Sequence, residues 1–101
     1  MSRQVEWSPT AAREFAAHLN YIGKRSVAAV HLVRGRVSEA VANLKSRPMG
    51  RVGRIDSTYE LYVSKTSLIL VYSIHENQAV NLLRVIHTSR DFKPDEYPPE
   101  T

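Results

Sequence analysis

Two amphipathic helical segments joined by a very short link occupy the first half of the chain, and this pairing limits the folds that the chain can adopt. Ser8-Pro9 starts the first segment, because a Ser hydroxyl can accept an orphan backbone N–H and Pro has no N–H to leave unpaired. Its apolar residues follow at helical spacing and are Ala12, Phe15, Ala16, Leu19 and Ile22. Gly23 stands where a left-handed residue would end the helix.

The second segment begins at Ser26, directly after the link Lys24-Arg25. Its apolar stripe repeats every three or four residues and consists of Val30, Val33, Val37, Val41 and Leu44. Gly35 weakens this helix by about 1 kcal/mol relative to Ala, and Pro48 ends it. Because the link is so short, the two helices are expected to form an antiparallel hairpin.

Strands are predicted on either side of the helical hairpin. Residues 4–7 form a short strand before it, and a basic loop at 46–57 follows it. Residues 59–63 then alternate as a half-buried strand does, residues 68–72 are apolar on both faces like a central strand, and residues 80–86 form the last strand. The expected class is α+β in the order β-α-α-β-β-β, with the hairpin on one face of a small, mainly antiparallel sheet and the other face partly open.

The length and composition limit the class of protein. We expect a single domain over residues 1–92 and an irregular, acidic, Pro-rich tail over 93–101. The absence of Cys excludes disulfides and thiolate chemistry and fits the cytoplasm. No stretch approaches the roughly 18 apolar residues that cross a bilayer, so no membrane association is expected. The net charge of +4 fits an acidic partner or nucleic acid without selecting between them.

The end of the last predicted strand, residues 82–91, is the leading candidate site. Arg84, His87 and Arg90 fall within seven residues there and could contact an anion or transfer a proton, since an unperturbed imidazole titrates near pH 6.5. The same residues could form an ordinary polar strand end, with the stem of Arg84 covering the sheet and its head reaching water. Arg51 and Arg54 could contact an acidic protein or nucleic acid, or they could simply belong to a solvated basic loop.

Metal and cofactor sites are not expected. His18, His31 and His75 lack the spacing of a metal-binding pair. The Gly50-Arg-Val-Gly53 run is too short for a nucleotide-binding fingerprint and does not open a helix. The sequence therefore predicts a protein without metal or cofactor.

Several motifs, in their order and spacing, resemble the RelE/ParE superfamily of bacterial toxins from type II toxin-antitoxin modules. They are Val5-Glu-Trp-Ser-Pro-Thr-Ala11, Pro48-Met-Gly-Arg-Val-Gly-Arg54, Tyr59-Glu-Leu-Tyr-Val63, Leu70-Val-Tyr72 and Leu83-Arg-Val-Ile-His87. The resemblance spans almost the whole chain and implies the same β-α-α-β-β-β order. It also implies a small cognate antitoxin that wraps the toxin and neutralises it.

The superfamily divides by mechanism. RelE-like toxins cut mRNA in the ribosomal A site with basic residues and a proton-transfer group on the sheet, whereas ParE-like toxins poison DNA gyrase. One typical RelE-like arginine directly precedes the Leu-Val-Tyr of the central strand, and here Ile69 takes its place. In addition, Tyr97 lies beyond Pro94 in the acidic tail, where carboxylates would repel RNA. These departures favour a ParE-like toxin.

The resemblance thus leads to an expected function and two alternatives. The favoured function is inhibition of growth by binding DNA gyrase, without catalytic residues. The residues expected to contact the target or the antitoxin are Arg51, Arg54, Arg84, His87 and Arg90. The first alternative is a ribosome-dependent mRNA endonuclease that uses Arg54, Arg84, His87 and Arg90. The second is a non-toxic relative that retains only antitoxin binding.

Overall fold

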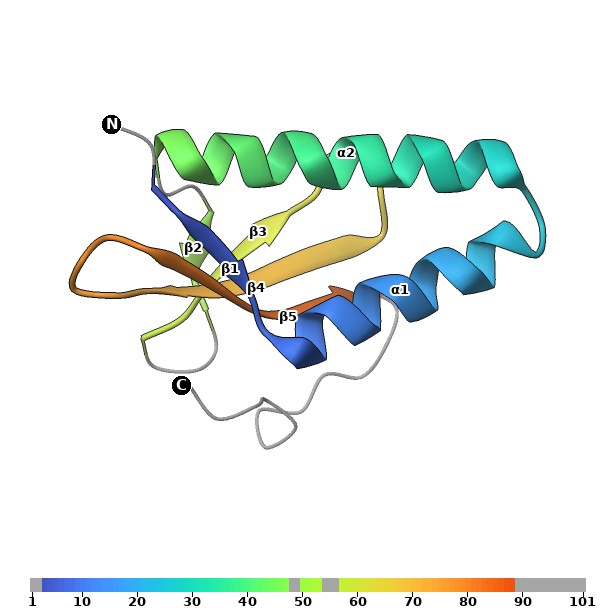
Figure 1. Ribbon diagram of the computed structural model, residues 1–101. Coiled ribbons are helices and arrows are strands. Elements are labelled where there is room, and N and C mark those ends of the chain that lie inside the picture. Colours follow the sequence, from blue (N-terminus) through green and yellow to red (C-terminus); the bar gives the residue numbers. More distant parts are fainter. Residues whose placement is uncertain (1–2, 48–49, 54–56, 89–101) are drawn as a thin grey trace.

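The computed structural model describes residues 3–47, 50–53 and 57–88 and has two helices packed on a mixed sheet of five strands (Figure 1). In chain order the elements are β1 (Val5–Trp7), α1 (Pro9–Gly23), α2 (Val27–Ser46), β2 (Arg51–Val52), β3 (Tyr59–Tyr62), β4 (Leu68–Ile74) and β5 (Val80–His87). The strand order is β1-β5-β4-β3-β2, with β1 parallel to β5 and every other pair antiparallel. The predicted α+β class, with a helical hairpin and a mainly antiparallel sheet, is therefore confirmed.

The strand β2 was not predicted, because two residues are too few to display the alternation of a strand. Arg51 and Val52 pair with Glu60 and Tyr59, so part of the expected basic loop extends the sheet beyond β3. Gly50 makes this possible: its φ is 99°, and a Cβ there would collide with the carbonyl oxygen of Glu60.

Both predicted helix starts are confirmed by their caps. The Ser8 hydroxyl accepts a hydrogen bond from the backbone N–H of Ala11 (3.0 Å), and the Ser26 hydroxyl accepts one from Ala29 (3.1 Å). The helix α1 ends at Gly23 as predicted, but the predicted left-handed conformation is wrong, since Gly23 is helical and does not have a positive φ. The glycine serves packing instead, because a Cβ at this position would lie 3.2 Å from Val30 Cγ2 of α2.

The inward face of α1 also differs from the predicted stripe by one residue. Ala11 is fully buried, whereas Ala12 and Ala16 are exposed. The small size of alanine explains the error, because it carries little information about which side of a helix faces the core.

The main core lies between the helices and the sheet. Leu68, Leu70 and Tyr72 of β4 point into it, together with Val37 and Leu44 of α2. The alternating residues of β4 face the other way, where Ile69, Val71 and Ile86 form a second buried cluster. The prediction that the central strand is apolar on both faces is thus confirmed. Tyr62, which pairs with Ile69 and shares this second face, is half exposed.

The described part of the chain contains no helix that is both long and apolar enough to cross a membrane. Pro48 and the predicted tail at 93–101 lie outside the described residues.

Candidate strand-end site

The strand β5 has β1 as a neighbour along its first half only. The strand β1 accompanies β5 only as far as the pair Trp7 and Leu82. A β-bulge follows, since Tyr72 of β4 pairs with Leu82 but the adjacent Val71 pairs with Arg84. Bulges bend a strand and redirect the side chains beyond them, which here belong to the predicted site.

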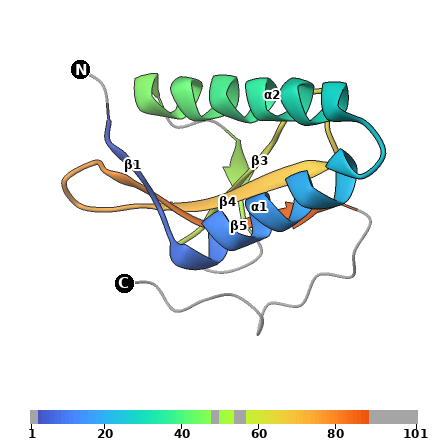
Figure 2. The ribbon, with the colours of Figure 1, turned by 45° about the vertical axis from the view of Figure 1, so that its right-hand side comes forward.

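Ser8 fixes the start of α1 against this bulge. Its backbone N–H donates to the carbonyl of Leu82 (2.8 Å), and its hydroxyl donates to the carbonyl of Leu83 (2.8 Å) while accepting from Ala11. The residue that follows β1 and caps α1 is therefore also bonded to β5. As a result α1 runs alongside the remainder of β5 (Figures 1 and 2).

Glu14, on the second turn of α1, bonds to the part of β5 that β1 no longer accompanies. The backbone N–H of Val85 donates to Glu14 Oε1 (3.1 Å), and Arg84 Nε lies 3.2 Å from each carboxylate oxygen. Arg84 Nη2 completes the ion pair with Glu14 Oε2. Only 14% of the Arg84 side chain and 24% of the Glu14 side chain are exposed. The head of Arg84 is thus held by a helix of the same chain and does not project into water.

His87 meets a second side chain of α1. The His18 ring, one helical turn after Glu14, lies 5.4 Å from the His87 ring, and the two planes are tilted by 47°. Both histidines are partly buried. Glu14 and His18 belong to α1, and their partners Arg84 and His87 belong to β5. We call Glu14, His18, Arg84 and His87 the strand-end cluster.

Arg51 lies apart from the strand-end cluster. It belongs to β2 at the far edge of the sheet, so β3 and β4 separate it from β5. Its side chain is 62% exposed, its guanidinium lies 5.3 Å from the centroid of the Tyr62 ring, and its nearest Glu60 oxygen is 3.9 Å away. The structure therefore places Arg84 and His87 each against α1, through Glu14 and His18, and leaves Arg51 apart. Arg54 and Arg90 lie outside the described residues.

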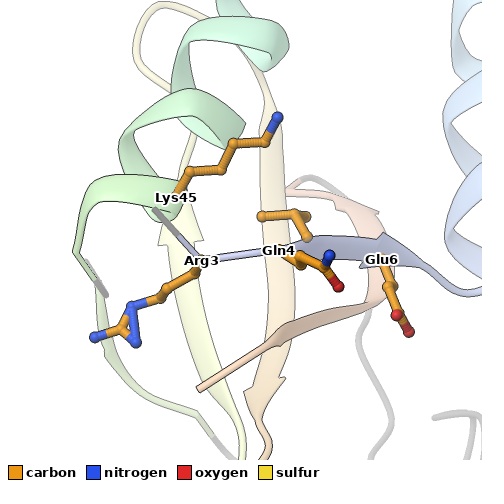
Figure 3. Close-up of a pocket in the computed structure, with 5 residues that line it drawn as sticks. Arg3, Gln4, Glu6 and Lys45 are labelled. Carbon is orange, nitrogen blue, oxygen red and sulfur yellow. The ribbon is translucent and has the colours of Figure 1, made fainter. Parts of the chain in front are cut away.

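A pocket of about 430 Å³ lies elsewhere, between the start of β1 and the end of α2 (Figure 3). Arg3, Gln4, Val5, Glu6 and Lys45 line it. In Figure 3 the charged side chains of Arg3, Glu6 and Lys45 point away from one another. Ligand sites usually have a few polar groups that converge, and this pocket does not.

Within the described ranges, no three His, Asp or Glu side chains are grouped so that they could hold a metal ion. The two imidazoles of the strand-end cluster fall short of a structural zinc site, which needs four ligands.

Glu14 and His18 are the site residues that sequence reasoning missed. A signal for them exists, because they follow the buried Ala11 by three and seven residues and so share its face of the helix. A carboxylate on the inward face of a helix needs a partner, and a strand-end arginine is a suitable one.

The comparisons with known proteins agree with this fold. The model of the family described as "ParE toxin of type II toxin-antitoxin system, parDE" matches residues 5–92. A solved structure described as "Chromosomal ParDE TA system from P. aeruginosa" is similar with a TM-score of 0.75 and 14% identity, over 87% of this chain and 98% of that chain. No curated protein matches significantly. The family match covers β1 through β5, and the chain belongs to the ParE toxin family of type II toxin-antitoxin systems.

Proposed function

We propose that this ParE-type toxin inhibits growth by binding DNA gyrase and that a cognate antitoxin neutralises it. The family match supports the toxin assignment, and the similarity to a chain of a ParDE system supports a partnership with an antitoxin. The choice of binding over RNA cleavage depends on the chemistry of the strand-end cluster.

The engagement of Arg84 by Glu14 is the observation that carries the proposal. Cleavage of mRNA requires cations available to the scissile phosphate and a group that can transfer a proton. Here the guanidinium is already neutralised by a carboxylate that would itself repel a phosphate. Ile69, at the position of a typical RelE-like arginine, is buried in the sheet and can do neither task. This arrangement favours a role in protein binding.

The contact residues are proposed to act in two ways. Arg51 is largely exposed and suits direct contact with an acidic surface of gyrase or antitoxin. Arg84 and His87 would shape the strand end through their contacts with α1. Arg54 and Arg90 complete the proposed contact set.

The decisive experiment compares two activities of the purified full chain. We expect the toxin to inhibit supercoiling of relaxed plasmid by gyrase and to leave ribosome-bound mRNA intact when the message is mapped by primer extension. If a small gene adjoins the toxin gene and encodes the antitoxin, adding its product should restore supercoiling. Cleaved mRNA with normal supercoiling would refute the proposal in favour of the nuclease. If the chain shows neither activity but still binds the antitoxin, it is a non-toxic relative.

A further inference from the structure

The excess positive charge of the protein is concentrated in one segment. Residues 15–38 contain Lys24, Arg25, Arg34 and Arg36 and no Asp or Glu. The whole chain has 14 Lys and Arg against 10 Asp and Glu, so basic and acidic residues outside this segment are equal in number. The net charge of +4 therefore belongs to the middle of the helical hairpin.

This segment includes the turn between α1 and α2, which extends beyond the end of the sheet in both views (Figures 1 and 2). Large apolar side chains are exposed there as well: Tyr21 is 58%, Val27 67% and Leu32 57% exposed. They make up three of the five large hydrophobic residues that are exposed in the described part of the chain. Exposed apolar and aromatic side chains that gather in one place commonly mark a protein contact.

The turn and one face of α2 carry both apolar and basic side chains. The Arg25 guanidinium lies over the Tyr21 ring, 5.3 Å from its centroid. Val27, His31 and Arg34 follow at helical spacing, and all three are exposed. We call Tyr21, Lys24, Arg25, Val27, His31 and Arg34 the hairpin tip.

The three cations of the hairpin tip are exposed. Among the residues that the structure describes, Lys24, Arg25 and Arg34 have no acidic side chain within ion-pair distance. The strand-end cluster differs in this respect, because its arginine is held by Glu14.

We propose that the hairpin tip is a docking surface for an acidic protein segment that carries apolar side chains among its carboxylates. Charge complementarity selects the acidic partner, since the tip holds three of the four cations that make up the positive excess of the chain. The exposed Val27 and Tyr21 select protein over nucleic acid, because interfaces with DNA are more polar than those between proteins. The inference rests on one part of the proposed function, namely that the toxin acts through contacts with proteins.

A binding assay with defined probes tests this inference. The probes are a labelled amphipathic peptide of Glu and Leu, its counterpart with Lys in place of Glu, and a short duplex DNA. The tip variant is Lys24→Glu/Arg25→Glu/Arg34→Glu in the full chain. The control variant, Arg13→Glu/Arg47→Glu/Lys65→Glu, makes the same charge change at three exposed positions outside the tip. Circular dichroism verifies that both variants fold.

The full chain should bind the acidic peptide and not its basic counterpart. The tip variant should weaken this binding roughly tenfold or more, and the control variant should weaken it less than about threefold. A second variant, Tyr21→Ser/Val27→Ser, should also weaken binding although its charge is unchanged.

If the tip variant and the control variant lose the same amount of binding affinity, the proposal is overturned, because the overall charge of the protein would then explain the binding. Preferential binding of duplex DNA through the same tip residues would also overturn it and indicate a nucleic-acid surface. Supercoiling by gyrase is measured separately, so a failure of the gyrase proposal leaves the peptide result interpretable.

Discussion

Glu14 shows how one side chain can take the place of a neighbouring strand. Where β1 ends, the backbone N–H of Val85 would face α1 without a partner, and the Glu14 carboxylate accepts its hydrogen bond. The same carboxylate pairs with Arg84, so a single residue satisfies a backbone donor and a guanidinium that are both largely shielded from water.

Glu14→Gln tests this role at the level of the residue. We expect the free energy of unfolding to fall by about 1 to 3 kcal/mol, because a charge-assisted network is lost while Arg84 stays largely buried. Denaturant titration measures the change. Glu39→Gln is the control, since Glu39 is exposed on α2 and its replacement should alter stability by less than about 0.5 kcal/mol. Equal effects of the two substitutions would show that Glu14 is an ordinary surface acid.

At the level of elements, the glycines of the hairpin differ in what surrounds them. Gly35 lies in the middle of α2, and a Cβ there would meet nothing within 4 Å. Gly23 lies at the end of α1, where a Cβ would press on Val30. The first glycine weakens a helix without a packing reason, whereas the second lets two helices approach closely.

Alanine substitutions should therefore give different results at the two positions. Gly35→Ala should stabilise the protein by about 0.5 to 1 kcal/mol, since alanine has the higher helix propensity and meets no obstacle. Gly23→Ala should gain less or lose stability, because Val30 must move. Thermal unfolding of the two variants beside the parent measures both effects. The packing argument fails if Gly23→Ala stabilises as much as Gly35→Ala.

The elements that sequence reasoning found are those whose signals are local. Ser8 and Ser26 mark the helix starts by their own chemistry, and the apolar run at residues 68–72 marks the central strand. The strand β2 was missed because its pairing depends on Gly50 approaching Glu60, which no local pattern encodes. For contacts that join distant residues, such as Glu14 with Arg84, the sequence can place Glu14 on the inward face of α1, but the topology decides its partner by placing α1 beside β5.

At the scale of the whole molecule, the parallel pairing of β1 with β5 joins the two ends of the described chain. The backbone N–H of Val80 donates to the carbonyl of Gln4, and that of Ser8 donates to Leu82. The helical hairpin lies between these strands in sequence and packs against the same core. A strand at the edge of a sheet could detach alone, but β1 is also anchored by Trp7, which packs against the core and lies 5.6 Å from Phe15 of α1 between ring centroids.

The pairing of β1 with β5 predicts that the protein unfolds in one cooperative step. Trp7 is the only tryptophan, so its fluorescence reports on β1 and α1, whereas far-ultraviolet circular dichroism reports on all helices and strands. The two signals should give coincident midpoints in a denaturant titration, because β1 cannot leave without exposing the core that both helices share. A fluorescence transition that precedes the dichroism transition would mean that β1 separates first. In that case the pairing of β1 with β5 would be too weak to hold the start of α1 against the strand end.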